Sequence, residues 1–490
     1  MFGLLRKKNK VAPSTPALYL HNTLEDKTEI FTPPTSGPVK MYNCGPTVYD
    51  VSHIGNLRSY VFADTLRRIL EYNDMTVKQV INITDFGHLS DDADRGDDKM
   101  TKGLKRKGLA LTIKNMRALA EEYTTIFTHD LQELNIATDK ITFPRASDYI
   151  PAQVALIQTL IEKGYAYETT HEVYFDTSRF PRYGELGNID LKHLKEGARV
   201  EANPEKKNFS DFVLWKKDEK LGWKSPWGQG FPGWHIECSS MARALLGEQM
   251  DIHTGGIDLM PTHHNNEIAQ SESVTGRKPF SRFWLHHAFL NLKDEKISKS
   301  LGNMISLSTL VERDYHPLSY RYLLLGAHYR TPMNFTWDAL EAAQTAFLRL
   351  RTFVDKSPKG GMVPASYQTR IHERLNDDLD TPGALAVVWE MLKDKDISSE
   401  NMRAGILDVD RVFGLGFAKP DEKANALYLK LFGEEISARD IPIEIQTILE
   451  KRESARASKD FKAADALRKQ IEDAGYKIED GNHVRLYKKV

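Results

Sequence analysis

The sequence predicts an α/β protein with a parallel β-sheet in its first half and mostly helices in its second half. Residues 39–85 contain a strand pattern, a glycine turn, a helix pattern and another strand pattern, which is the order of one βαβ unit. After Asn303 the apolar residues follow helical spacing almost to the end of the chain. For 490 residues, at roughly 100–200 residues per domain, we expect about three domains.

The charge balance and the cysteines limit the kinds of protein that this chain can be. Lys and Arg number 67 against 68 Asp and Glu, so net charge predicts no partner, although a neutral total can include a basic face that binds nucleic acid. Cys44 and Cys238 are too few for a disulfide-rich secreted scaffold. No apolar stretch approaches the ~20 residues that span a bilayer. We therefore expect a cytoplasmic protein with no membrane partner and a disordered tail over residues 1–17.

A candidate phosphate site lies at the start of the first helix. The strand over residues 39–43 is followed by the turn "CGPTVYD", and the helix pattern starts near Asn56. In a Rossmann-like unit of this kind the active edge lies at the carboxyl ends of the strands. His53, Gly55 and Asn56 lie where helix N–H groups have no intrahelical partner and favour an anion. This segment predicts phosphate binding, and an ordinary turn is the alternative.

A second candidate phosphate site is "KISKS", residues 296–300, which follows the strand-like segment "HAFLNLKDE". Lys296 and Lys299 are three residues apart and flanked by serines. Such donors stabilise a polyphosphate most where charge develops in a transition state. By itself the segment also fits a solvated run of charges.

A candidate metal site combines the cysteines with a histidine and a glutamate. His263 and Glu267 are spaced i, i+4, so a helix starting there would present both on one face. Thiolate, imidazole and carboxylate together are typical zinc ligands. Cys44, Cys238 and the His263–Glu267 pair come from separate segments, each predicted near a strand end or a helix start. They could converge at the active crevice, and unrelated buried thiols are the alternative.

The phosphate motifs, in this order and separated by an insertion, resemble the paired signature of class I aminoacyl-tRNA synthetases. Further stretches make the chain similar to the cysteinyl-tRNA synthetase family over nearly all of its length: "YNCGPTVYDVSHIGN", "GWHIECSSM", "DIHTGGIDLMPTHHNNEIAQSES", "KISKSLGN" and "SARASKDFKAADALRKQIEDAGYKIED". The resemblance implies ATP-dependent activation of L-cysteine and its transfer to the 3′-terminal adenosine of tRNA(Cys). It also implies one Zn²⁺ per chain and Mg²⁺ with ATP, and we expect a monomer.

The resemblance assigns roles to individual residues of this chain. The zinc ligands are Cys44, Cys238, His263 and Glu267. The residues around the substrate amino acid are Gly45, Thr47, Trp234 and Asp258. The catalytic residues are His53, Asn56, Lys296 and Lys299, of which His53, Asn56 and Lys299 also bind ATP together with Gly55. Because zinc binds a thiolate more strongly than a serine hydroxyl, we expect discrimination without an editing domain.

The implied architecture is a Rossmann-like, parallel-sheet catalytic domain with an insertion, then a helical bundle and a small C-terminal anticodon-binding domain. The predicted boundaries are 1–17 for the tail, 18–145 and 213–285 for the two halves of the catalytic domain, 146–212 for the inserted segment, 286–330 for the "KISKS" loop and stem-contact region, 331–437 for the bundle, and 438–490 for the anticodon-contacting domain.

Some features depart from the family pattern or remain open. The first motif usually ends in His, and here it ends in Asn56, which can donate a hydrogen bond but carries no charge. The acidic stretch 86–100, with His88, suggests either a second metal site or a solvated loop. Tyr476 and Tyr487 are candidates for reading tRNA bases. The alternative functions are a cysteine ligase acting on an amino sugar and an inactive tRNA-binding paralogue.

Overall fold

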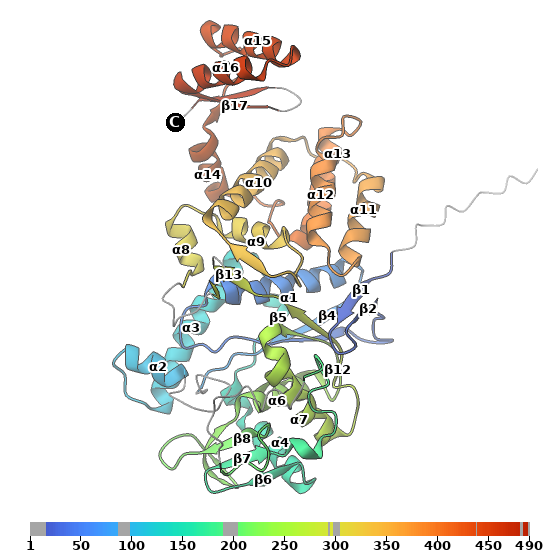
Figure 1. Cartoon of the computed structure of the whole chain (residues 1–490), viewed down its shortest axis with the longest axis vertical. Coiled ribbons are helices and arrows are strands. Elements are labelled where there is room, and N and C mark those ends of the chain that lie inside the picture. The colour runs from blue at the N-terminus through green and yellow to red at the C-terminus, as the bar shows by residue number, and fades with distance from the viewer. Residues whose placement is uncertain are drawn as a thin grey trace, which may run out of the picture.

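The computed structural model describes residues 16–86, 99–189, 204–292, 295–296, 304–437, 439–480 and 484–488. The molecule is elongated, and its C-terminal helices α15 and α16 lie at the opposite end from the antiparallel strands β6 to β8 (Figure 1). The parallel sheet and the helical bundle lie between them, with helix α1 at their junction. Within the described residues, no helix is both long and apolar enough to cross a membrane.

The central sheet has five strands in the order β12-β11-β3-β4-β5. Its strands are β3 (Val39–Asn43), β4 (Val77–Ile81), β5 (Ile141–Thr142), β11 (Met250–Gly256) and β12 (Ser281–His287). Every pairing in it is parallel. Because β3 pairs with both β4 and β11, segments about 170 to 210 residues apart in the chain form one continuous sheet. This arrangement confirms the Rossmann-like prediction.

Helices cover both faces of the parallel sheet. Helix α1 (Ile54–Tyr72) connects β3 to β4, and α2 (Lys99–Arg106) and α3 (Ile113–Glu133) lie between β4 and β5. On the other face α4 (Ile150–Glu162), α6 (Trp234–Leu246) and α7 (Asn265–Thr275) pack together (Figure 1). Short helical turns occur at η1 (Thr138–Lys140), η2 (Ala146–Tyr149), η3 (Thr177–Arg179), η4 (Ile257–Leu259) and η5 (Met260–His264).

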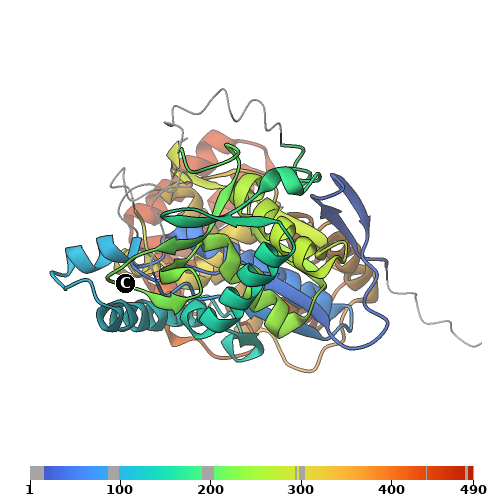
Figure 2. The same ribbon diagram turned by 90° about the horizontal axis from the view of Figure 1, so that it is seen from below.

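An antiparallel sheet is inserted between the halves of the parallel one. Its order is β6-β7-β8-β10-β9, formed by β6 (Ala166–Glu168), β7 (Glu172–Phe175), β8 (Phe212–Lys217), β9 (Trp223–Ser225) and β10 (Gly228–Pro232). Figure 2 views the molecule from the end that carries this sheet. The sheet continues to Pro232, beyond residue 212 where the sequence pattern places the end of the insertion.

A helical bundle packs on the half of the molecule that contains the parallel sheet, through α1. Its helices are α8 (Leu307–Glu312), α9 (Pro317–Leu325), α10 (Trp337–Lys356), α11 (Ala365–Asn376), α12 (Thr381–Met391), α13 (Ser399–Phe413) and α14 (Glu422–Phe432). Buried residues of α1, such as Leu57 and Leu66, belong to the same apolar core as Val409 and Phe413 of α13. The bundle and the sheet domain therefore share one continuous core.

Small strands complete the fold. β1 (Tyr19–Asn22) and β2 (Lys27–Ile30) form a hairpin, and β13 (Leu290–Leu292), β14 (Glu295–Lys296) and β15 (Met333–Phe335) form a sheet beside the bundle. At the C-terminus α15 (Ile443–Ala457) and α16 (Phe461–Asp473) pack on β16 (Glu434–Glu435), β17 (Tyr476–Glu479) and β18 (Arg485–Lys488). This last unit has a separate core of Ile445, Ile471, Ile478 and Leu486.

Candidate active site

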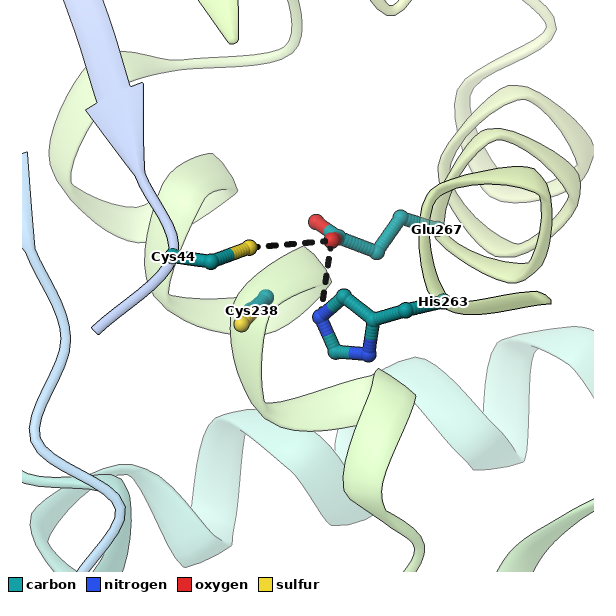
Figure 3. Close-up of side chains that lie close together, drawn as sticks. All are labelled: Cys44, Cys238, His263 and Glu267. Atoms are coloured by element: carbon teal, nitrogen blue, oxygen red, sulfur yellow. Dashed lines mark hydrogen bonds and ion pairs between the residues drawn. The ribbon is translucent and has the colours of Figure 1, made fainter. Parts of the chain in front are cut away.

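Four side chains with metal-ligating atoms meet at the carboxyl edge of the parallel sheet (Figure 3). Cys44 directly follows β3, Cys238 lies on α6, and His263 and Glu267 lie where η5 continues into α7. One ligand atom from each lies within 4.8 Å of the others. Cys238, His263 and Glu267 are buried, and Cys44 is half-buried. The structure thus brings together the set that the sequence predicted.

Local structure explains how these side chains are held. The Cys44 N–H donates to the Thr254 carbonyl at 3.2 Å, which ties the end of β3 to β11. The wide turn of η5 leads directly into α7, so His263 and Glu267 face the same side and form an ion pair of 3.0 Å between Nε2 and Oε1. Cys238, in the second turn of α6, faces the same space (Figure 3).

Two further histidines line the site and were missed by the sequence analysis. The Nε2 atom of His253 is 3.0 Å from Glu267 Oε2, and the Nε2 atom of His264 is 3.3 Å from Cys44 Sγ. With Cys44 and Glu267 they form a second set that could hold a metal. His253 lies in β11, where a strand pattern gives no reason to distinguish a polar core residue from a ligand. His264 is adjacent to a predicted ligand, and that was the available signal.

The Glu267 carboxylate is ionised within this buried cluster. Burial alone would raise its pKa, but the neighbouring charges and hydrogen bonds of His253 and His263 lower the pKa to about 2. Burial would likewise lower the pKa of His263, while the charge of Glu267 raises it to about 10. In such an arrangement a metal cation can replace an imidazolium as the positive charge beside the buried carboxylate, or bind next to it.

Gly45 and Thr47 lie in the loop that directly follows Cys44. The Gly45 N–H donates to Asn82 Oδ1 at 2.7 Å, and a Cβ atom at Gly45 would overlap the Asn82 carbonyl. Only glycine therefore fits at this point. Thr47 pairs with Thr84 in an isolated parallel bridge, so the loop after β3 follows the loop after β4. Both residues lie on the segment that links Cys44 to His53.

Trp234 and Asp258 lie on other elements near the same space. Trp234 is the first residue of α6, and the centroid of its ring is 4.5 Å from that of His263. Asp258 lies in η4 directly after β11, is exposed, and has a carboxylate that a Cβ at Gly256 would overlap. Both could therefore contact a small molecule bound beside the cluster.

The first phosphate motif forms the N-terminus of α1. His53 is the N-cap, and its Nδ1 accepts from the Asn56 N–H at 3.1 Å. The Asn56 Oδ1 accepts in return from the His53 N–H at 3.4 Å, which completes a capping box. Asn56 is exposed, and Gly55 leaves the space against which the His53 ring packs. The polar end of a 19-residue helix is thus presented to solvent.

The second phosphate motif lies partly outside the described residues. Lys296 ends β14, and its side chain, like the whole of Lys299, is not among the described parts. The segment that follows the motif is attached to the first motif, because the Ile54 N–H donates to the Ile305 carbonyl at 2.8 Å and His53 pairs with Ser306. On the preceding side, Arg58 of α1 donates to the Phe289 carbonyl at 2.6 Å. Both flanks therefore lie against α1.

Solved structures of similar shape define the class of this fold. Two structures of the methionyl-tRNA synthetase of Mycobacterium tuberculosis with methionyl-adenylate match with TM-scores of 0.52 and 0.53 at 15% and 14% identity. Each match covers 80% of this chain and 91% of the other. The model of the class I (C) tRNA synthetase catalytic domain matches residues 30–345. The fold is that of a class I aminoacyl-tRNA synthetase.

Sequence relatives show to which family within this class the chain belongs. The model of the cysteinyl-tRNA ligase anticodon-binding domain matches residues 438–485. Cysteine–tRNA ligase 1 of Burkholderia lata is 43% identical, with 94% of this chain and 95% of that protein covered. The cysteine–tRNA ligase of Treponema denticola is 39% identical over 97% of this chain and all of that protein. The chain belongs to the cysteine–tRNA ligase family.

Proposed function

We propose that this enzyme joins L-cysteine to tRNA(Cys) through a cysteinyl-adenylate, and that a zinc ion selects the substrate thiol. The observation that carries the proposal is the convergence of Cys44, Cys238, His263 and Glu267 next to a helix N-terminus with a phosphate motif. The location expected for such an enzyme is the cytoplasm, and we expect a monomer.

The four donors fit a zinc ion. Zinc–ligand bonds of about 2.0–2.3 Å place ligands of one tetrahedral ion roughly 3.3–3.8 Å apart, which is compatible with atoms that all lie within 4.8 Å. Two thiols and an imidazole are soft and borderline donors, which favour zinc over magnesium or calcium, and zinc also accepts a carboxylate oxygen. When bound, zinc would bind the soft sulfur of the substrate thiolate more strongly than it would bind the hydroxyl oxygen of serine.

The residues of the chain would position both substrates. Gly45 and Thr47 shape the wall beside the thiol, and Asp258 offers a carboxylate to the amino group of cysteine. The N-terminus of α1, with His53, Gly55 and Asn56, would bind ATP phosphates. Lys296 and Lys299 are proposed to hold the phosphates from the opposite side, with Mg²⁺ accompanying ATP. Catalysis then rests on positioning and on donors at the α-phosphate.

The C-terminal unit offers a surface for the tRNA anticodon. Phe461 at the start of α16 is 64% exposed, and Lys459 and Lys462 on either side of it are exposed too. An exposed aromatic ring between cations suits stacking on an unpaired base with phosphates nearby. Tyr487, in contrast, is fully buried and accepts a hydrogen bond from the Tyr428 hydroxyl at 3.1 Å. Its ring is therefore not exposed for stacking on a tRNA base, and the prediction that it reads a base is wrong. Tyr476 is half-buried and stays a candidate.

The amino-sugar ligase is the nearest competing function. It would need the cysteine and ATP sites but no anticodon-binding end, whereas residues 438–485 match an anticodon-binding domain. The inactive paralogue would need damaged motifs, and the metal-ligand set is intact.

Charging of total tRNA with labelled cysteine and ATP tests the proposal. We expect acid-precipitable label that depends on both tRNA and ATP and that falls after prolonged treatment with a zinc chelator. Cysteine-dependent pyrophosphate exchange without any charging would favour the amino-sugar ligase. No signal in either assay would favour the inactive paralogue.

A further inference from the structure

A lysine outside the assigned motifs lies over the substrate-side tryptophan. Lys99 is the first residue of α2, and its Nζ lies 5.6 Å from the centroid of the Trp234 ring. A cation at this distance over an indole is attracted by the negative face of the ring. The same ring packs against His263, so the Trp234 indole contacts both the Lys99 ammonium and one member of the metal-ligand cluster.

Helix α2, which begins at Lys99, packs closely on its neighbours one turn further on. A Cβ at Gly103 would lie 2.9 Å from both the Tyr49 carbonyl oxygen and Leu119 Cδ2, so α2 approaches these groups as closely as a glycine allows. Lys99 and Gly103 are spaced i, i+4 and share a face of the helix.

An ion pair secures the other end of α2. Arg106 Nη1 lies 2.5 Å from Asp50 Oδ2, and Arg106 Nη2 donates to the Tyr49 carbonyl at 3.1 Å. Tyr49 and Asp50 belong to the segment that runs from Cys44 to His53. Helix α2 is therefore docked on the loop that joins the cluster to the phosphate motif.

The ligand set would leave an excess of negative charge once a divalent metal ion is bound. With both cysteines as thiolates, they and the Glu267 carboxylate would carry more negative charge than that ion neutralises, and a bound substrate thiolate would add to the excess. Asp258, in η4, adds an exposed carboxylate on the residues that follow β11. The substrate carboxylate and the ATP α-phosphate must nevertheless come together in this negative field.

We propose that Lys99 binds the carboxylate of the substrate cysteine and screens its charge as it approaches ATP. The proposal rests on the proposed function. In the step concerned, a carboxylate oxygen forms a bond to the α-phosphorus, the bond from that phosphorus to the oxygen bridging to the β-phosphate breaks, and pyrophosphate leaves with the electron pair. Lys99 keeps its proton throughout and changes only the electrostatic cost of bringing the anions together.

The test compares Lys99→Gln, Lys99→Arg and the control Lys102→Gln in the zinc-loaded full chain. Lys102 is an exposed lysine on the same helix. Cysteine-dependent ATP–pyrophosphate exchange without tRNA gives kcat and KM, and cysteamine, which lacks the carboxylate, serves as a competitive inhibitor. Removing one hydrogen bond to a charged group should reduce kcat/KM for cysteine about ten- to a hundredfold in Lys99→Gln. Lys99→Arg should recover part of this loss, and Lys102→Gln should match the wild type.

The cysteamine inhibition constant separates carboxylate binding from a structural role. If Lys99 binds the carboxylate, this constant stays within about twofold of the wild-type value in Lys99→Gln while the KM for cysteine rises. Equal weakening of cysteine and cysteamine overturns the proposal, and so does normal exchange with lost tRNA charging, which would make Lys99 a tRNA contact. Absence of exchange in the wild type and in Lys102→Gln would instead contradict the proposed function.

Discussion

Asp64 on α1 and Arg321 on α9 form a fully buried ion pair, with 2.6 Å between Oδ2 and Nη2. Arg321 also donates to the carbonyls of Phe413 at 2.6 Å and Leu134 at 2.9 Å, which close the ends of α13 and α3. One guanidinium thus joins the helix that carries the phosphate motif to the helical bundle. This contact links the helix at whose N-terminus ATP phosphates are proposed to bind to the bundle that precedes the C-terminal unit.

Asp64→Asn should destabilise the protein strongly. The change leaves the buried Arg321 charge without its partner, and breaking a buried pair in this way costs about 3–5 kcal/mol. We expect a clear decrease in the urea midpoint of unfolding. Glu133→Gln is the matched control, because it removes an exposed ion pair with Lys423, and such pairs contribute about 0–1 kcal/mol. Equal midpoints for the two variants would contradict the assigned importance of the Asp64–Arg321 pair.

The contribution of Asp64 should depend on pH. Burial would raise the pKa of this carboxyl, but the charges of Arg321, Arg68 and Arg67 hold its pKa well below the usual value. A folded-state pKa below the unfolded one contributes stability that is fully present above about pH 4 and is lost as the pH falls further. The difference in urea midpoint between wild type and Asp64→Asn should therefore shrink below about pH 4. A difference that grows under acid would contradict this sign.

Gly45→Ala should impair cysteine activation while the fold persists. The added methyl group would overlap the Asn82 carbonyl, so the loop carrying Cys44 and Thr47 must move. A shift of about 1 Å in positioning can reduce the rate roughly a hundredfold. Pyrophosphate exchange measures this effect. Gly326→Ala is the control, since Gly326 has an ordinary φ of −75° and its nearest neighbour would be the Leu323 carbonyl oxygen at 3.3 Å. Normal pyrophosphate exchange by Gly45→Ala would contradict this prediction, because the loop after Cys44 would then tolerate the added methyl group.

Asn56 should act through both its cap and its lack of charge. Asn56→Asp keeps an acceptor for the His53 N–H but adds a negative charge where phosphates are proposed to bind. We expect unchanged thermal stability and a KM for ATP raised at least about tenfold, because the added carboxylate and the phosphates repel each other at the helix N-terminus.

Asn56→His, which restores the usual family residue, tests whether Asn is non-optimal. Turnover equal to or above wild type would fit that interpretation, and a collapse of turnover would show that the local site has adapted to Asn.

Sequence patterns predicted the strand over residues 39–43 with the bounds that the structure has, and they placed His263 and Glu267 on one side of a helix start. These features are encoded locally, by turn residues and by the i, i+4 period. The Asp64–Arg321 pair was not predictable, because a charged residue within a helix does not indicate a partner 257 positions away. His253 was missed for a related reason: its role depends on Glu267, which folding alone brings to 3.0 Å.

Cys238→Ala should remove the metal and the activation of cysteine together. The thiol is 2% exposed and is one of four donors, so a three-donor remnant in a buried site would bind zinc much more weakly. Zinc per chain, measured by elemental analysis after dialysis, should fall from one toward zero, and cysteine-dependent pyrophosphate exchange should fall with it. Ser240→Ala is a suitable control on the same helix, because its hydroxyl donates to the Glu237 carbonyl at 2.9 Å within the helix. Full exchange activity in a zinc-free preparation would contradict the proposed role of the metal. The residues around the substrate, such as Gly45 and Trp234, would then have to distinguish cysteine from serine without it.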